Sequence, residues 1–154
     1  MKTLAQERCQ AEVVRRLMTV RPDSASRWGR MSAPQMVCHL SDAFRMAIGT
    51  KPVSDATGRL QRTLVKWIAL YLPMPWPTGR LETRPEIDQH QGSATRPGEF
   101  AADVAELTAL MEIITTRDQS FQWPAHPIFG RMSKAAWLRW AYLHMDHHLR
   151  QFGA

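Results

Sequence analysis

The chain is poor in cysteine, and this scarcity excludes two kinds of architecture. Only Cys9 and Cys38 occur among its 154 residues. Two cysteines form neither a disulfide framework nor a zinc site built from cysteine pairs. A chain that does not depend on disulfides suits a reducing compartment. We therefore expect a cytoplasmic protein.

Long apolar runs are also missing. Residues 1–8 contain no apolar run of the length that a secretory signal needs. The longest apolar stretch runs from Trp67 to Leu72, far short of the ~20 residues that span a bilayer. We expect no membrane among the partners of this protein.

Basic residues are in moderate excess, but they are not clustered. The 20 lysines and arginines outnumber the 14 acidic residues and leave a net charge of +6. They are scattered along the chain, whereas a nucleic-acid face needs a basic patch or stripe. We expect no nucleic acid partner. Three catalytic signatures are absent too: a glycine-rich phosphate loop, a nucleophile elbow and paired carboxylates at a useful spacing.

The patterns that are present are helical. No segment alternates convincingly between apolar and polar residues, as a strand would. Four long amphipathic helices and a long crossover from Thr50 to Gly98 predict an all-α four-helix bundle. We expect residues 1–154 to form one domain. The five predicted helices, the third a short one inside the crossover, cover about 3–20, 32–49, 59–72, 99–116 and 133–151.

Apolar stripes indicate which helix faces are buried. The first helix is expected to bury a stripe, and so is the fourth, where the apolar spacing of 4, 3, 4 and 3 is regular. The crossover helix also has apolar residues at helical spacing. After it, three prolines between Pro73 and Gly79 predict extended backbone, and Arg80 to Gly98 is predicted as loop. The stripes are Leu4, Ala11, Val14 and Met18 in the first helix, Leu60, Leu64, Trp67, Ile68 and Tyr71 in the third, and Phe100, Val104, Leu107, Met111 and Ile114 in the fourth.

Two helix starts are marked by capping residues. Ser32 and Gln35 have the spacing of a capping box, and Ser133 is placed to cap the last helix. The tetrapeptide Gly-Arg-Met-Ser occurs twice, at 29–32 and at 130–133, each time before a helix that carries histidines. Convergent capping chemistry explains such an echo, and so does an old duplication of a helix pair; one tetrapeptide does not decide between them.

Three histidines indicate a metal site. His144 and His148 are four residues apart, so on a helix they lie on one face, one turn apart. This is the spacing of zinc-binding HExxH helices, although the glutamate of that motif is missing. His39, at the margin of the apolar stripe of the second helix, is the natural third ligand. Three imidazoles with an open position are typical of a catalytic divalent metal, and zinc, nickel and iron(II) all accept them.

Several neighbouring residues have more than one interpretation. His147 also pairs with His144, at three-residue spacing, and could replace His148. We prefer His148, which leaves His147 pointing to an interface or to solvent. Asp42 and Asp146 are candidate acceptors for a ligand N–H. His126 is expected to hydrogen-bond loop backbone. Other side chains are expected to pack: Cys38 in the core, and the tryptophans in the core or as loop anchors, with Trp76 and Trp123 as candidates for a pocket mouth.

Several segments of the sequence, together with the histidine pattern, resemble the DinB-like superfamily of metal-binding four-helix bundles, which includes the YfiT-type proteins. The similarity extends over nearly the whole chain and is strongest with a bacterial branch of domains of unknown function. It is carried by the segments Trp28-Gly29-Arg30-Met31-Ser32, Gln35-Met36-Val37-Cys38-His39-Leu40, His126-Pro127-Ile128-Phe129-Gly130 and His144-Met145-Asp146-His147-His148-Leu149-Arg150-Gln151-Phe152-Gly153.

The resemblance implies a fold, a metal and a reaction class. The bundle would run up-down-down-up and would often be a homodimer. Zinc or nickel would bind His39, His144 and His148. Characterised relatives include transferases and isomerases that use low-molecular-weight bacterial thiols, and many other members have no assigned activity.

Three functional hypotheses follow. The first is a metal-dependent enzyme, a thiol-dependent S-transferase that acts on a small electrophile. The second is a non-catalytic protein that binds a metal or a small molecule, for example as an accessory in a stress response. The third is a bundle without metal that serves as a dimeric interaction module.

Overall fold

The computed structural model describes residues 1–78 and 83–154. Within these ranges the chain is helical, and its only β-type pairing is an isolated bridge between His126 and Gly130. The all-α class predicted from the sequence is confirmed. The elements are α1 (Glu7–Leu17), α2 (Ala33–Ala47), the π-helical turn η1 (Gln61–Val65), α3 (Lys66–Tyr71), the 3-10 turn η2 (Pro85–Ile87), α4 (Phe100–Thr116) and α5 (Lys134–Gln151).

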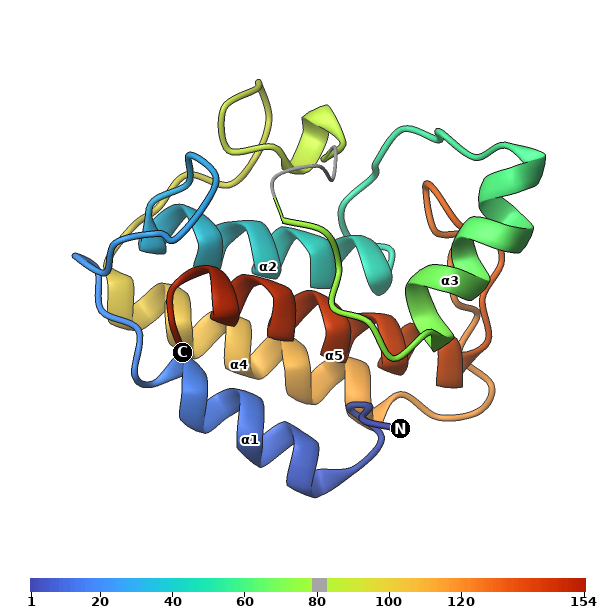
Figure 1. The fold of residues 1–154 in the computed structure, drawn as a ribbon, viewed down its shortest axis with the longest axis horizontal. Helices are drawn as coiled ribbons and strands as arrows, with labels where there is room; N and C mark the ends of the chain where they lie inside the picture. Colours follow the sequence, from blue (N-terminus) through green and yellow to red (C-terminus); the bar gives the residue numbers. More distant parts are fainter. Residues whose placement is uncertain (79–82) are drawn as a thin grey trace.

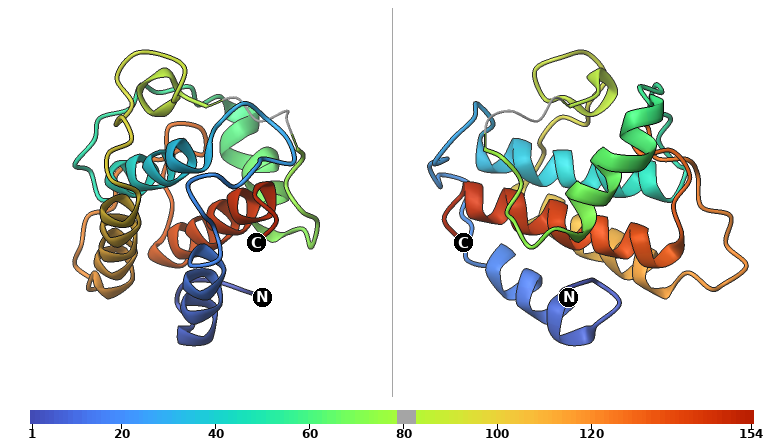
Figure 2. Two further views of the ribbon diagram at one scale, coloured as in Figure 1. Left: turned by 90° about the vertical axis from the view of Figure 1, so that its left-hand side faces the viewer. Right: turned by 45° about the vertical axis from the view of Figure 1, so that its right-hand side comes forward.

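The long helices α1, α2, α4 and α5 lie side by side around a shared core, as Figure 1 and the end-on view in Figure 2 show. α2 packs against α4 and α5, and α1 packs against α5. α1 and α5 run in one direction, and α2 and α4 run in the other (Figure 1). The arrangement is compatible with a four-helix bundle, and it makes α2 and α5 antiparallel.

The helix caps form as predicted. The Ser32 hydroxyl accepts the Gln35 backbone N–H at 3.3 Å, and the Gln35 side chain accepts the Ser32 backbone N–H at 2.9 Å. Ser133 likewise accepts the backbone N–H of Ala136 at 3.2 Å. These bonds satisfy N–H groups that have no partner inside the helix.

Both copies of the repeated tetrapeptide form a turn that leads into a capped helix start. Gly29 and Gly130 both have positive φ angles, +76° and +65°, a conformation that glycine adopts without steric cost. Three residues later, Ser32 and Ser133 cap α2 and α5. Capping chemistry therefore accounts for the echo without a duplication.

The stripe predicted for the first helix is wrong. α1 buries Cys9, Val13 and Leu17, whereas Met18 is 61% exposed. Leu4 is buried, but it lies in the turn before the helix and so does not set the helical phase. The stripe predicted for α4 is confirmed from Val104 to Ile114, with Phe100 half-buried at the start of the helix.

The crossover between α2 and α4 contains the predicted short helix, formed by η1 and α3 and ending at Tyr71. The backbone is extended at Leu72, as the residue before a proline requires. η2 interrupts a segment that was predicted as loop only. Residues 79–82, which include Arg80 and the end of the proline segment, lie outside the described residues.

Across the described ranges, no helix combines the length and the apolar character needed to cross a membrane.

Candidate metal centre

Two helices bring the three predicted ligands together. His39 comes from α2, and His144 and His148 come from successive turns of α5. Nε2 of His144 lies 3.1 Å from Nε2 of His39 and 3.2 Å from Nε2 of His148. The candidate ligand atoms of the three residues all lie within 4.8 Å of one another, and all three side chains are buried. The structure thus forms the cluster that the sequence predicted.

A backbone carbonyl sets the tautomer of His39. Its Nδ1 lies 2.9 Å from the carbonyl oxygen of Ile87 in η2. A carbonyl oxygen only accepts hydrogen bonds, so Nδ1 carries the proton and Nε2 presents a lone pair to the cluster.

A glutamine does the same for His148. The Gln151 side-chain NH₂ donates to the carbonyl oxygen of Trp28 at 2.7 Å. The Gln151 side-chain oxygen therefore faces Nδ1 of His148, 2.8 Å away, and accepts its proton. Nε2 of His148 is left with a lone pair directed at His144.

His144 is the member of the cluster whose ring nitrogens lack suitable hydrogen-bond partners. Its Nε2 faces two nitrogens that both present lone pairs, and its Nδ1 is buried with no hydrogen-bond partner. If Nε2 of His144 carries the proton, it can donate a good hydrogen bond to His39 or to His148, but not to both. Buried polar atoms are rarely left in this state without a functional reason.

A metal ion bound between the three Nε2 atoms would accept all of their lone pairs, and the distances between these atoms fit such an ion. Zinc–nitrogen bonds of about 2.0–2.1 Å at tetrahedral angles separate the ligand nitrogens by about 3.3 Å. The two observed Nε2 separations, 3.1 and 3.2 Å, are close to this value. Nitrogen-only ligands suit zinc, nickel and iron(II), and they do not suit calcium or magnesium.

Burial keeps the three ligands neutral. It lowers the pKa of His39, and it lowers the pKa values of His144 and His148 well below the ordinary value for histidine. For His144, the neighbouring imidazoles lower the pKa further. Metal ligation requires the neutral imidazole, so the site is prepared for a cation at neutral pH.

The orientation predicted for His147 is wrong. His147 is buried, and its ring lies 5.8 Å from that of Trp28 and 6.0 Å from that of Trp76, measured between centroids. It therefore faces the interior and not an interface or solvent, but it is not a member of the cluster of candidate ligands. Trp28 and Trp76 come from two loops whose positions helical periodicity does not predict.

The prediction for His126 is confirmed in detail. Its Nδ1 accepts the backbone N–H groups of Ile128 and Phe129, both at 3.1 Å. The hydrogen must therefore be on Nε2. The ring stacks on Phe129 at 4.6 Å and meets the edge of Trp140 at 5.1 Å. Burial lowers its pKa to about 3, so His126 stays neutral at physiological pH.

The two aspartates predicted to support the ligands have other partners. The buried carboxylate of Asp42 accepts hydrogen bonds from Arg45, Lys51 and Thr95. Asp146 pairs with Arg16 and Arg150. The prediction for both aspartates is wrong, because basic side chains and the crossover occupy their oxygens. The acceptors for ligand N–H groups are the Ile87 carbonyl and Gln151 instead.

Cys38 is buried, as expected, and its Sγ lies 3.7 Å from a carboxylate oxygen of Asp103. Burial, followed by the charge of Asp103, raises the pKa of this thiol to about 12. Cys38 is therefore a neutral thiol at physiological pH, packed as the sequence predicted.

A cavity of about 900 Å³ opens next to the cluster. The three ligands, His126 and His147 all line it, and so do Trp28, Trp76 and Trp140. Its volume is in the range that holds a small molecule. The wall is mainly apolar and also carries several polar side chains, a composition that suits a ligand site.

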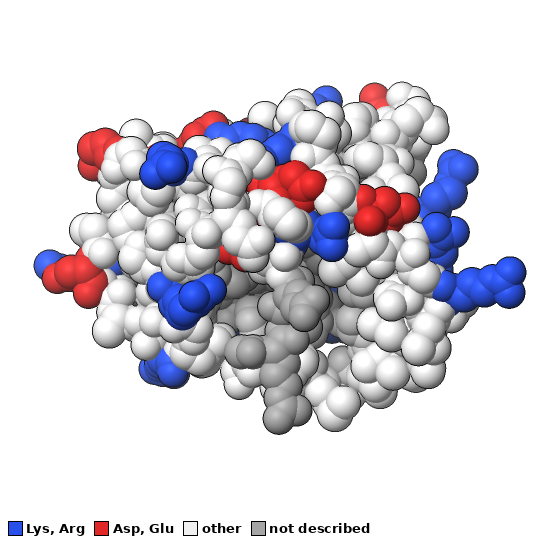
Figure 3. Space-filling view, turned by 90° about the horizontal axis from the view of Figure 1, so that it is seen from above, with Lys and Arg blue, Asp and Glu red and all other residues white. Residues whose placement is uncertain are grey.

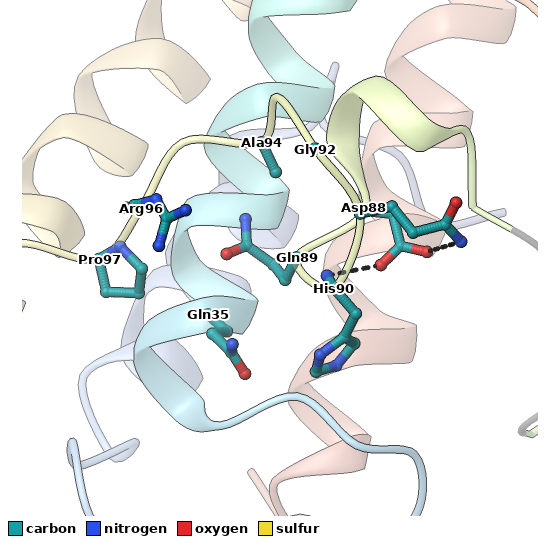
Figure 4. A pocket seen from close by; sticks show the side chains of 9 residues that line it. Gln35, Asp88, Gln89, His90, Gly92, Ala94, Arg96 and Pro97 are labelled. Atoms are coloured by element: carbon teal, nitrogen blue, oxygen red, sulfur yellow. Dashed lines mark hydrogen bonds between the residues drawn. The ribbon is translucent and has the colours of Figure 1, made fainter.

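A second, smaller pocket of about 490 Å³ contains none of the three ligand histidines. Figure 4 shows it between Gln35 at the start of α2, the loop around Asp88 and His90, and Arg96. The Asp88 carboxylate is occupied by its own loop, where it accepts the backbone N–H of His90 at 2.8 Å and the side chain of Gln91 at 3.1 Å.

Fold and site together define a helical protein with a buried three-histidine cluster beside a cavity that three tryptophans help to line. Residues 5–154 match the model of the family described as "Protein of unknown function (DUF1569)", and the chain belongs to this family. No curated protein and no solved structure matches the chain. The family description states no activity, so function has to be argued from the site.

Proposed function

We propose that this protein is a metal-dependent enzyme whose metal is held by His39, His144 and His148. The observation that carries the proposal is the convergence of three neutral Nε2 atoms, with the tautomers of His39 and His148 set by Ile87 and Gln151. Zinc or nickel suits this donor set best, and iron(II) also fits.

We further propose that the bundle has the DinB-like, up-down-down-up arrangement. Two features support this. α1 and α5 run opposite to α2 and α4, and the long connection lies between α2 and α4. In addition, each segment that resembles the superfamily contributes to the cavity: Trp28, His39, His126 and His144 all line it.

The reaction we propose is thiol-dependent S-transfer to a small electrophile. A divalent metal, when bound, lowers the pKa of a thiol or a water molecule and so supplies a nucleophile near neutral pH. In S-transfer the thiol sulfur forms a bond to the electrophilic carbon, the leaving group departs with the electron pair, and the thiol proton goes to solvent. A low-molecular-weight thiol and a small electrophile both fit a cavity of about 900 Å³.

The protein's own groups would orient the electrophile and exclude water. Nε2–H of His126 has no hydrogen-bond partner among the described residues, while its ring is held on the cavity wall. It is placed to donate a hydrogen bond to an oxygen of the substrate, and its low pKa keeps this donor neutral. The rings of Trp28, Trp76 and Trp140 form apolar walls that limit the access of water.

Elemental analysis of protein purified without an affinity tag tests the proposal. We expect close to one equivalent of a transition metal, and loss of that metal in His144→Ala but not in His147→Ala. Less than about a tenth of an equivalent in the wild type contradicts every metal-dependent role. Full metal occupancy in His144→Ala contradicts the ligand assignment.

Turnover separates catalysis from simple binding. The metal-loaded protein is assayed with a panel of small electrophiles and the common bacterial thiols. Metal occupancy without turnover of any pair would favour the second hypothesis, a non-catalytic binding protein. The homodimer that the resemblance implies is tested separately by light scattering.

A further inference from the structure

The crossover helix turns its apolar stripe outward. Its residues, which we call the α3 stripe, are between 40% and 57% exposed. On α3 itself only Leu70 is buried. An amphipathic helix normally directs such a stripe to the core, so this one is left without a partner inside the chain. The α3 stripe comprises Leu60, Leu64, Trp67, Ile68 and Tyr71.

The exposed area is large for a protein of this size. The five side chains together expose on the order of 500 Å², near the upper end of the largest apolar patch on a typical monomer. Met74, which follows α3, is a further 61% exposed. Patches of this size usually mark an interaction surface.

The charged residues of the segment that carries the stripe have one sign. Residues 56–78 contain three basic residues, Arg59, Arg62 and Lys66, and no aspartate or glutamate. None of the three forms an ion pair with another described residue. Arg62 bonds to the Thr57 hydroxyl at 2.8 Å, and Lys66 donates to the carbonyl of Arg131 at 3.2 Å. In Figure 3, basic side chains project at the right-hand edge, the end where Figure 1 places this helix.

We propose that the α3 stripe docks on an anionic lipid surface. Helices that lie in the headgroup layer have leucine and aromatic residues on one face and lysine or arginine on the other. Trp67 and Tyr71 are residue types that favour the boundary between headgroups and acyl chains. The long side chain of Arg59 can extend toward anionic headgroups while its stem stays beside the helix.

Charge favours a bilayer over the other candidate partners. A second copy of this face would bring a second set of three unpaired cations against the first, with no acid in residues 56–78 to neutralise them. A nucleic acid would bind the cations, but it would leave five large apolar side chains facing phosphate and water. An anionic bilayer accommodates both the cations and the apolar stripe.

This proposal departs from the expectation of no membrane partner. That expectation considered only spanning segments and not a helix lying on the surface. Docking also has a consequence for the cavity, because Val65, Ile68 and Met74 line it on the same side. The docked face would then include one edge of the cavity, so that a ligand could enter from the bilayer.

Vesicle co-sedimentation tests the proposal with the full chain. We expect the wild type to bind vesicles that are about one third phosphatidylglycerol, and to bind pure phosphatidylcholine at least tenfold more weakly. Trp67→Ser should weaken binding at least tenfold and Arg59→Gln about fivefold. Met18→Ser, which removes an equally exposed apolar side chain from the end of α1, should leave binding unchanged. All three positions are exposed, so the variants should unfold at the wild-type temperature.

Other results overturn the proposal. These are no binding to anionic vesicles, equal binding to neutral vesicles, or an equal loss of binding in Met18→Ser. A dimer in light scattering that Trp67→Ser dissociates would assign the face to a second copy. Quenching of tryptophan fluorescence by spin-labelled lipid adds a direct readout. It should fall in Trp67→Leu while vesicle binding remains.

Discussion

The side-chain oxygen of Gln151 lies 2.8 Å from Nδ1 of His148. The amide of the same glutamine is fixed by the carbonyl of Trp28 at 2.7 Å. One side chain on α5 thus connects a candidate ligand to the loop before α2, and it determines which nitrogen of His148 faces the cluster. A Cβ added at Gly29 would lie 2.7 Å from this amide nitrogen, so the glycine leaves room for the connection.

Removing this connection should weaken metal binding. Gln151→Leu keeps much of the volume but removes the acceptor for Nδ1 of His148. We expect metal affinity to fall by about 10- to 100-fold, the usual effect of losing a partner that orients a ligand. Competition with a chelating dye measures the affinity. Gln10→Leu, which removes a glutamine bound to the Leu4 carbonyl away from the site, is the control and should bind metal normally. Unchanged affinity in Gln151→Leu would show that Gln151 does not orient His148.

Asp42 should contribute to the stability of the fold and not to metal binding. Its fully buried carboxylate bonds Arg45 and Lys51 and the Thr95 backbone, and so ties the crossover to α2. Burial raises the pKa of Asp42, but the hydrogen bonds from Lys51 and Thr95 outweigh it and lower the pKa overall. Asp42→Asn leaves Lys51 without its counterion and Arg45 with only Glu106 among the described residues, which should cost about 3 kcal/mol of unfolding free energy. Urea unfolding measures this loss, and metal stoichiometry in the folded variant should not change. If Asp42→Asn lost metal but kept the wild-type stability, Asp42 would belong to the metal site and not to the scaffold.

Two substitutions at His126 separate its two roles. The oxygen of an asparagine can take the place of Nδ1 and accept the Ile128 and Phe129 N–H groups, but asparagine has no group at the position of Nε2. The amide of a glutamine can reach the Nε2 position but does not cap the loop. His126→Asn should therefore keep most of the stability and lower kcat/KM about 10- to 100-fold, the effect of one lost hydrogen bond to substrate.

His126→Gln should show the opposite balance, with lower stability and a larger share of the activity retained. Nitrogen-15 NMR of the wild type gives a readout that does not depend on activity, and it should show the proton on Nε2. A proton on Nδ1 would contradict the structure. Equal activity in His126→Asn and the wild type would remove His126 from substrate binding.

Burial of His126 makes stability depend on pH. Its pKa is about 3 in the folded protein and about 6.5 in an unfolded chain. Above the unfolded value both states are neutral, and His126 adds no pH dependence. Below it, the unfolded chain binds a proton that the folded protein does not, so stability falls by about 1.4 kcal/mol per pH unit until the folded pKa is reached.

Urea unfolding across this pH window, with a chelator present so that metal does not contribute, measures the slope. His126→Asn has no imidazole to protonate and should lose stability less steeply than the wild type as the pH falls. Equal slopes would show that His126 is not protected from protonation in the folded state.

Local signals in the sequence were sufficient for the starts of α2 and α5 and for the pairing of His144 with His148. Ser32, Gln35 and Ser133 act within one turn of the chain, so the starts of α2 and α5 could be predicted closely. His144 and His148 share a helix face because of their spacing alone. Gln151 could also have been predicted, because it lies three positions after His148 and so on the same helix face.

Other parts of the site carry no such signal. The acceptor for His39 is a backbone carbonyl, at Ile87, and a carbonyl is the same in every residue. Asp42 and Asp146 had suitable chemistry for that role, but partners distant in sequence bind their oxygens: Thr95 binds Asp42, and Arg16 binds Asp146. The burial of His147 depends on Trp28 and Trp76, which two separate loops bring to it.

By itself, the sequence determined where helices begin, which faces are amphipathic and which histidines share a face, because these properties depend on residues within a few positions of one another. Tertiary structure alone decided that α2 and α5 run antiparallel with His39 and His144 in contact, that the tautomers are set from η2 and from the loop before α2, and that the α3 stripe faces outward. Each of these depends on packing between segments far apart in the chain, which periodicity does not encode.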